Sequence, residues 1–123
     1  MMRSLPFGSL SAGLPEALPE ETFETLICSK HFRLERILSK GHVSPQGFWY
    51  EPETDEWVAL IQGEAELEIE GDDQPLRLHP GDWVCLPRGR RHRVSYTAPD
   101  EISVWLALHG DFDPMPSPSE GEG

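Results

Sequence analysis

The most constraining feature of the sequence is a strict two-residue alternation near the middle of the chain, within residues 56–70. Ala65, Leu67 and Ile69 alternate there with Glu64, Glu66, Glu68 and Glu70. Because successive side chains of a β-strand point to opposite faces of the sheet, this pattern predicts one buried face and one wet face. Antiparallel sheets commonly pack one face on a core and expose the other to water. We therefore expect a fold built from antiparallel strands.

Turn signals follow this stretch at short intervals. Gly71-Asp72-Asp73 followed by Leu76-Arg77-Leu78 predicts a hairpin, and Pro80-Gly81-Asp82 predicts a second turn. Trp83 to Leu86 is expected to be a short apolar strand, and Pro87 to Arg91 a further turn. Many short strands separated by Gly and Pro turns favour a sandwich or a barrel.

Alternating residues predict strands on both sides of this region as well. Phe32 and Leu34 alternate with polar neighbours, and His92 to Tyr96 alternates again. A last alternating strand carries Ile102, Val104, Leu106 and Leu108. Glu21 to Leu26, by contrast, is compatible with one helical turn.

The two ends of the chain differ from this middle region in composition. Residues 1–20 combine three prolines with scattered leucines and predict an irregular N-terminal arm. Its apolar residues are too many for a solvated tail, so we expect the arm to lie across its own barrel or a neighbour's: Leu5, Phe7, Leu10, Leu14 and Leu18. Residues 113–123 are rich in Pro, Ser, Gly and acidic residues and predict a disordered tail. A single barrel domain is therefore expected over residues 21–112.

The charge balance limits the partners of the chain. Asp and Glu outnumber Lys and Arg by 22 to 10, and the formal net charge of −12 disfavours nucleic acid and anionic membrane surfaces. One basic cluster stands out, and it is either a rim that holds an anionic group or a solvated turn: Arg88, Arg90, Arg91 and Arg93.

The cysteines and the apolar segments indicate a compartment. Cys28 and Cys85 form no metal-ligand pattern and are expected to be buried thiols, which suit a reducing environment. No segment has the apolar length of a membrane span or the pattern of a signal peptide. We expect a cytoplasmic protein.

The segment from Gly81 to His92 resembles the second sequence motif of the cupin family. That motif is Gly, five residues, Pro, one residue, Gly, two residues, His, three residues and Asn, and Gly81, Pro87, Gly89 and His92 stand at these spacings. Tyr96 stands in the place of the final Asn. The glycines and the proline turn the chain sharply enough to direct one histidine into a barrel. The resemblance implies a small single-domain bacterial cupin with an all-β, RmlC-like jelly-roll barrel, also called a double-stranded β-helix.

The first cupin motif is matched only in its second half. It consists of His-x-His, three or four residues, Glu, six residues and Gly, and Glu56 and Gly63 stand at the last two positions. With a four-residue gap the two histidine positions fall on Trp49 and Glu51, and with a three-residue gap they fall one residue later. Both histidines are therefore replaced.

In metal-bearing cupins these motif residues hold a divalent transition metal. By this resemblance Glu56 and His92 are candidate ligands, with Glu51 as a third because a carboxylate can take the place of a histidine. His42 or Tyr50 could also reach the pocket from the preceding loop. The alternative is that Glu56 and His92 form a buried pair without a metal, acting as general acid and base or as the polar anchor of a ligand. No organic cofactor is indicated.

The candidate ligand pocket combines aromatic residues with the basic cluster: Trp49, Tyr50, Arg90 and Tyr96. These aromatic rings either form a stacking surface for a planar or sugar-like ligand or fill the core of the barrel. The remaining histidines are expected on the surface or as caps: His31, His79 and His109.

Three functions stay open at this level. The first is a cupin that binds a small molecule, and the second is a metal-dependent enzyme of the dioxygenase or isomerase type. The third is an oligomeric scaffold. A homodimer is compatible with all three, and the resemblance implies that residues 5–18 could be exchanged between its two copies.

Overall fold

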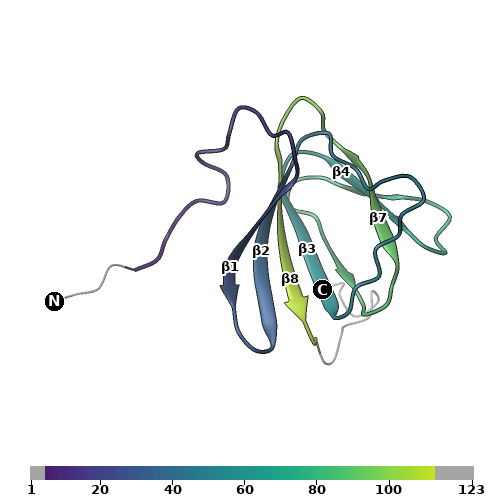
Figure 1. Ribbon diagram of the computed structural model, residues 1–123. Helices are drawn as coiled ribbons and strands as arrows, with labels where there is room; N and C mark the ends of the chain where they lie inside the picture. Colours follow the sequence, from purple (N-terminus) through teal and green to yellow (C-terminus); the bar gives the residue numbers. More distant parts are fainter. Residues whose placement is uncertain (1–4, 113–123) are drawn as a thin grey trace.

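Eight strands, all paired antiparallel, make up residues 5–112, the part of the chain that this computed structural model describes (Figure 1). They are β1 (Thr22–Cys28), β2 (Phe32–Ser39), β3 (Asp55–Gln62), β4 (Ala65–Ile69), β5 (Leu76–Leu78), β6 (Trp83–Leu86), β7 (His92–Thr97) and β8 (Ser103–Gly110). One sheet has the order β1-β2-β8-β3-β6, and the other has the order β5-β4-β7. The predicted all-β class is confirmed, and no helix in residues 5–112 could span a membrane.

The alternation in β4 separates core from surface as predicted. Ala65 and Leu67 are buried, whereas the glutamates between and beside them are half-buried or exposed. The predicted hairpin is confirmed, because Ala65 pairs with Leu78 and Leu67 pairs with Leu76 across β4 and β5. The core lies between the two sheets and contains side chains of β3, β4, β5, β6 and β8.

The segment that is compatible with a helical turn is instead β1. It pairs with β2 from Thr22 to Cys28, so tertiary pairing decides its structure. Every residue of β1 is exposed, because the strand lies at the edge of its sheet. Cys28 at its end is exposed too, which differs from the predicted buried thiol, and Cys85 is half-buried.

The five-stranded sheet has apolar side chains on both of its faces. Trp105 and Ala107 of β8 belong to the core between the sheets. Val104, one position along from Trp105, packs on the other face with Leu14 and Leu18 of the N-terminal arm. The arm therefore covers part of the outer face of this sheet.

The beginning of the arm leaves the barrel, as Figure 1 shows for its purple segment. Leu5 is 83% exposed and Phe7 is 97% exposed. No strand or helix forms between residues 5 and 20. The predicted disordered tail, residues 113–123, lies outside the described residues.

Gly63 marks the corner between β3 and β4. Its φ of 96° lies in the left-handed region, and an added Cβ would come within 2.2 Å of the Ser103 Oγ atom. The Ser103 hydroxyl donates to the Glu64 carbonyl at 3.2 Å and accepts from the Glu64 N–H at 3.3 Å. These two hydrogen bonds connect the corner to the start of β8.

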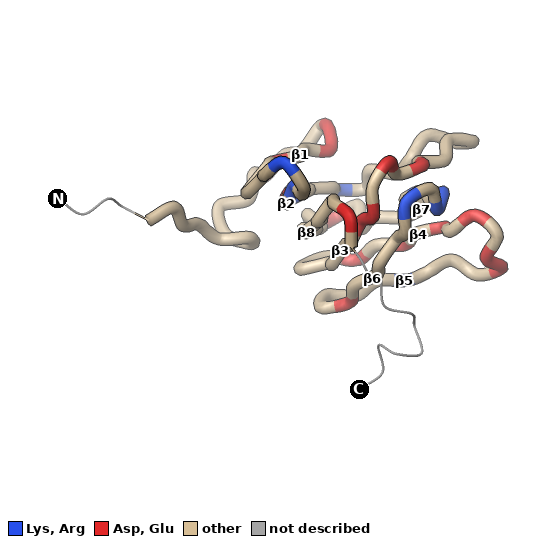
Figure 2. The backbone as a smooth tube through the Cα atoms, turned by 90° about the horizontal axis from the view of Figure 1, so that it is seen from below, with Lys and Arg blue, Asp and Glu red and all other residues tan. Residues whose placement is uncertain are grey.

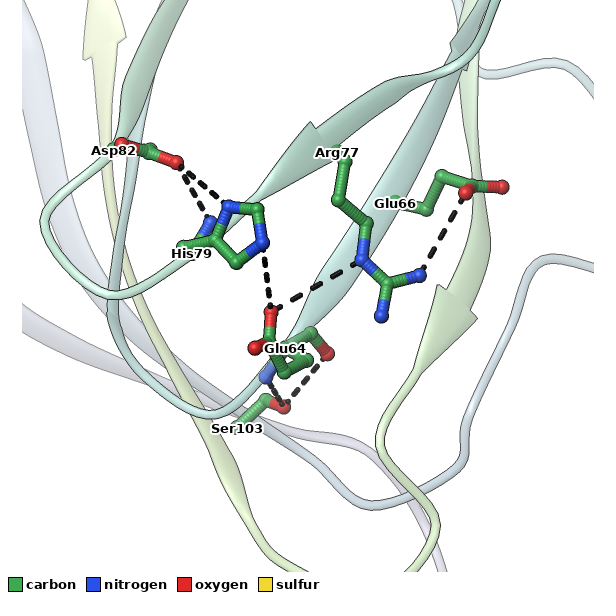
Figure 3. A network of polar contacts seen from close by, with 6 residues as sticks. All are labelled: Glu64, Glu66, Arg77, His79, Asp82 and Ser103. Carbon is green, nitrogen blue, oxygen red and sulfur yellow. Dashed lines mark hydrogen bonds and ion pairs between the residues drawn. The ribbon is translucent and has the colours of Figure 1, made fainter.

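A polar network continues from this corner to the turn between β5 and β6 (Figure 3). The Glu64 Oε2 atom lies 3.8 Å from His79 Nε2 and 4.0 Å from Arg77 Nε. Asp82 Oδ2 accepts from the His79 backbone N–H at 2.8 Å and lies 3.4 Å from His79 Nδ1. His79 is therefore a surface residue, in agreement with the prediction for it.

Candidate functional site

A cavity of about 480 Å³ opens between the two sheets. Its apolar wall includes Ile37, Val58, Leu67 and Trp105, from β2, β3, β4 and β8. Polar side chains from both sheets and from the loop before β3 also line it, among them Arg33, Glu35, Tyr50, Glu56, His92 and His109. An apolar cavity of this size with a few convergent polar groups is typical of a small-molecule site.

Glu56 is the most unusual of these residues. Its side chain is 8% exposed, and its Oε1 atom is buried with no hydrogen-bond partner in the described part of the chain. Burial raises the pKa of the Glu56 carboxyl, and the neighbouring imidazoles of His109 and His92 oppose that rise. A buried carboxyl with a raised pKa can take up and release a proton, or can bind a polar group of a ligand.

His92 reaches the cavity in the way that the second motif predicts. The turn at Gly89, with φ of 79°, brings the chain back, and β7 begins at His92. Its Nδ1 atom lies 3.1 Å from the Arg90 carbonyl oxygen, and because a carbonyl can only accept, Nδ1 carries a proton. The other ring nitrogen, Nε2, lies 3.7 Å from Glu56 Oε1.

Tyr50 lies beside His92 through a two-way backbone bridge. The Tyr50 N–H donates to the His92 carbonyl at 2.8 Å, and the His92 N–H donates to the Tyr50 carbonyl at 2.9 Å. The two rings meet edge to face with centroids 5.3 Å apart. Burial raises the pKa of the Tyr50 hydroxyl, and the Glu56 carboxylate raises it further. Tyr50 lines the cavity, as the sequence analysis expected of it.

His109 and Glu35 form a second pair in the cavity that sequence reasoning missed. His109 Nε2 lies 2.8 Å from Glu35 Oε1, and the two side chains are 11% and 10% exposed. The prediction that His109 lies on the surface or caps a strand is therefore wrong. His109 is two and four residues from Ala107 and Trp105, so strand alternation places it on the same inner face. That phase relation identifies His109 as a cavity residue once the inner face of β8 is known.

Trp49 and Glu51 lie outside the cavity, which differs from their predicted places. Both are neighbours of Tyr50, and where Tyr50 points inward an extended chain turns the adjacent side chains away. Trp49 lines a separate hollow beside residues 68–75. Glu51 is exposed and lies 3.9 Å from Arg91.

Tyr96 also lies outside the cavity, because a β-bulge interrupts β7. Leu67 pairs with Val94, but the next residue back on β4, Glu66, pairs with Tyr96, so Ser95 is the extra residue. The bulge reverses the alternation, so Tyr96 points away from the cavity. The Arg77 Cζ atom lies over the Tyr96 ring, 4.5 Å from the ring centroid. The alternation of residues within β7, counted from His92, does not reveal such a shift, because a bulge depends on the pairing with β4.

Figure 2 shows basic residues in blue at and just before the start of β7, and each of them forms an ion pair with an acidic residue. Arg90 lies 2.8 Å from Asp72, Arg91 lies 2.8 Å from Glu70, and Arg88 lies 2.7 Å from Asp111. Arg93 pairs with Glu68 in the same way. Arg90 does not line the cavity, so the solvated-turn interpretation fits it, whereas Arg93 does line it.

The cavity has a further cation, Arg33, at its rim. Its side chain is 49% exposed, and its Nε atom lies 3.6 Å from Glu35 Oε2. His42 instead turns away, since its Nδ1 accepts from the Lys40 N–H at 2.8 Å and its Nε2 lies 3.3 Å from the Pro19 carbonyl.

The predicted divalent metal does not fit the residues present. Within residues 5–112, no group of three or more His, Cys, Asp or Glu side chains is arranged to hold a metal ion. Glu51, the expected third ligand, lies outside the cavity, and His109 is hydrogen-bonded to Glu35. Glu56 and His92 alone are fewer protein ligands than tightly bound divalent ions usually have.

Comparison with known proteins agrees with this architecture. The family model described as "Cupin domain" matches residues 35–109. A protein of Ralstonia eutropha JMP134 named a "putative mannose-6-phosphate isomerase" has a similar crystal structure, with a TM-score of 0.85. It is 44% identical, and the match covers 88% of this chain and 100% of that protein. A search of curated proteins finds no match.

More distant structures share the fold. A cupin superfamily protein of Desulfitobacterium hafniense DCB-2 is 18% identical with a TM-score of 0.68, over 90% of this chain and 94% of its own. An RmlC-like cupin family protein of Methanocaldococcus jannaschii, with a double-stranded β-helix fold, is 16% identical with a TM-score of 0.62, over 80% of this chain and 86% of its own. These similarities confirm the predicted double-stranded β-helix.

Proposed function

Because the chain belongs to the cupin domain family, we propose that its barrel binds a small organic molecule in the cavity between the two sheets. The observation that carries this proposal is the buried Glu56 carboxyl, which lines the cavity and takes part in no hydrogen bond among the described residues. Its Oε1 atom is fully enclosed, so Oε2 is the oxygen that a ligand can reach. An unpaired buried oxygen costs free energy, so a ligand that donates a hydrogen bond to it gains affinity. His92 and Tyr50 flank the same point and can complete the polar end of the site.

Isothermal calorimetry with a panel of small hydroxylated and anionic molecules tests this proposal. D-mannose 6-phosphate, D-fructose 6-phosphate and inorganic phosphate are included. Glu56→Gln keeps the shape of the side chain but removes the carboxylate, and we expect it to weaken binding about tenfold or more. Glu66→Gln, which changes a carboxylate on the outer face of β4, is the matched control and should bind as the wild type does. Equal affinities for wild type and Glu56→Gln would overturn the proposal.

A second candidate function is an isomerase that acts on a sugar phosphate. The protein of Ralstonia eutropha that is 44% identical carries such a name, and the raised pKa of the Glu56 carboxyl suits proton transfer. Isomerisation of a hydroxy aldehyde to a hydroxy ketone moves a proton between adjacent carbons. A base takes the proton from the carbon next to the carbonyl and returns it to the neighbouring carbon, while the two oxygens exchange a proton. Glu56 is the candidate base.

Conversion of D-mannose 6-phosphate to D-fructose 6-phosphate tests this candidate directly. The wild-type protein should form the ketose and incorporate deuterium from heavy water, and Glu56→Gln should be slower by about a hundredfold or more. If binding occurs without conversion, the isomerase candidate fails and the binding function remains.

The metal prediction has its own measurement. We expect protein purified without nickel affinity to hold much less than one equivalent of any transition metal, because the donor set does not fit one. One equivalent in the wild type that is lost in His92→Ala would instead make His92 a metal ligand, and the enzyme hypothesis would then require the metal.

A further inference from the structure

We propose that His109, oriented by Glu35, is a ligand-binding residue, and that it and Glu56 together recognise neighbouring hydroxyl groups of the ligand. This inference rests on the proposed function and names the chemistry that the same cavity selects. It concerns a pair of residues on β2 and β8, outside both of the cupin motifs discussed above.

The hydrogen bond to Glu35 determines which atom of His109 is free. Because a carboxylate accepts, the 2.8 Å contact uses the Nε2–H of His109 as donor. In the neutral ring, Nδ1 then carries the lone pair. No hydrogen bond among residues 5–112 uses this Nδ1, and it is not among their fully buried atoms without a partner. Nδ1 can therefore accept a hydrogen bond from a molecule in the cavity.

Glu56 supplies the second acceptor on the same face. Glu56 and His109 are directly opposite each other across β3 and β8, and such partners have Cβ atoms about 5 Å apart. The Glu56 side chain is more than nine-tenths buried, and no hydrogen bond among residues 5–112 uses its carboxyl. Its Oε1 atom is fully enclosed, but Oε2 is not, so Oε2 is the oxygen that can accept from a ligand. His92 can add a third acceptor, because its Nδ1–H donates to the Arg90 carbonyl and the lone pair of the uncharged ring is then on Nε2.

Three acceptors in one small volume favour a ligand with several donors. Hydroxyl groups on adjacent carbons provide donors that are close together, and each can turn toward its acceptor. A ligand without such donors leaves these atoms unpaired, and unpaired buried groups cost affinity. The cavity is thus expected to prefer a polyhydroxylated molecule over a molecule of the same size that lacks one hydroxyl.

Calorimetry with a matched pair of ligands tests the inference. D-mannose 6-phosphate and 2-deoxy-D-glucose 6-phosphate differ in that the second lacks the hydroxyl at carbon 2. We expect the wild type to bind the first about tenfold more tightly, and His109→Gln to reduce that ratio toward one. His79→Gln changes a histidine that also contacts a carboxylate but lies outside the cavity, and it should keep the wild-type ratio.

Glu35 is a positioning residue, so its variant must act through His109. Glu35→Gln should lower the ratio less than His109→Gln does, and the double variant should be no worse than His109→Gln alone. A purely structural role of Glu35 would lower both affinities together and would add to the effect of His109→Gln. Glu35→Gln also provides a test if His109→Gln does not fold.

The outcomes separate this inference from the proposed function. If the wild type binds both sugar phosphates equally, or if His109→Gln keeps the wild-type ratio, the inference is overturned while the binding function remains. If the wild type binds no member of the panel, the proposed function fails and the inference fails with it.

Discussion

Two glycines with nearly the same backbone angle have very different surroundings. Gly63 has φ of 96° and Gly81 has φ of 95°. A Cβ at Gly63 would meet Ser103, whereas a Cβ at Gly81 would meet no atom within 4 Å. Alanine substitutions at the two positions therefore separate the free-energy cost of a left-handed backbone from the cost of a steric clash.

We predict that Gly63→Ala lowers the free energy of unfolding by about 2 to 4 kcal/mol, because strain and overpacking add. Gly81→Ala should cost only about 1 kcal/mol, since it carries the strain alone. Urea denaturation of both variants measures the difference. Equal losses would mean that Ser103 moves aside without cost.

The buried carboxyl of Glu56 should make stability depend on pH. Burial raises its pKa in the folded protein above the value in the unfolded chain, so between these two values the folded state binds more protons. The stability that this group contributes is present below the unfolded pKa and is lost as pH rises through the folded pKa.

Glu56→Gln removes this titration while it keeps the shape of the side chain. We predict that the variant melts a few degrees above the wild type at about pH 8, and that the difference shrinks toward about pH 4. Thermal melts at both pH values provide the measurement. A difference that is the same at both, or that grows toward acid pH, would contradict the raised pKa.

At the scale of elements, most strands follow from alternation and turn chemistry. The hairpin of β4 and β5 and the short strand β6 lie where the sequence predicts them. β1 does not, because its conformation comes from pairing with β2 and not from its own pattern. Local sequence carries no information about such a partner.

The sequence predicted the cavity residues only where a cupin motif contributes them. Glu56 and His92 follow from the two cupin motifs, and both line the cavity. His109 was missed because β8 has apolar residues on both faces, so the strand alone does not reveal which face is inner. Tyr96 was misplaced because the bulge at Ser95 depends on the pairing of two strands.

The arginines at the cavity and near it should differ in function according to their partners. Arg90 is paired with Asp72 outside the cavity, whereas Arg33 lines the rim. The one acidic partner of Arg33 within residues 5–112 is Glu35, at 3.6 Å. We predict that Arg33→Gln weakens the binding of sugar phosphates about fivefold to tenfold. Arg90→Gln should leave affinity unchanged and cost less than about 1 kcal/mol of stability. Calorimetry measures the affinities, and urea denaturation measures the stability of Arg90→Gln. An equal loss of affinity in both variants would mean that Arg90 also contributes to ligand binding.

At the scale of the whole molecule, the outer face of the five-stranded sheet is apolar beyond the part that the arm covers. Trp57, Leu108 and Phe112 line a hollow of about 370 Å³ there, and Trp83 nearby is 54% exposed. Apolar surface of this kind is typical of an interface. The arm contacts the same face at Val104 and at Arg36, which donates to the Leu10 carbonyl.

We propose that a second copy of the chain covers this face, which would account for the predicted homodimer. Sedimentation should give about twice the monomer mass of 13.9 kDa. Leu108→Glu would place a charge in the interface and should yield monomers. Val43→Glu changes an exposed apolar residue elsewhere and should not. A wild-type monomer at every concentration would exclude both the homodimer and the scaffold hypothesis.

The exposed strand β1 has a consequence for how a molecule enters the barrel. It contributes Phe23 to the cavity wall, yet all of its residues are exposed, and among the described strands it pairs only with β2. Strands with few buried contacts open locally at a low free-energy cost. In hydrogen exchange, the amides of β1 should therefore lose protection well before those of β8, which is buried and paired on both sides. Detachment of this edge would admit a ligand sideways, while the rest of the barrel stays folded.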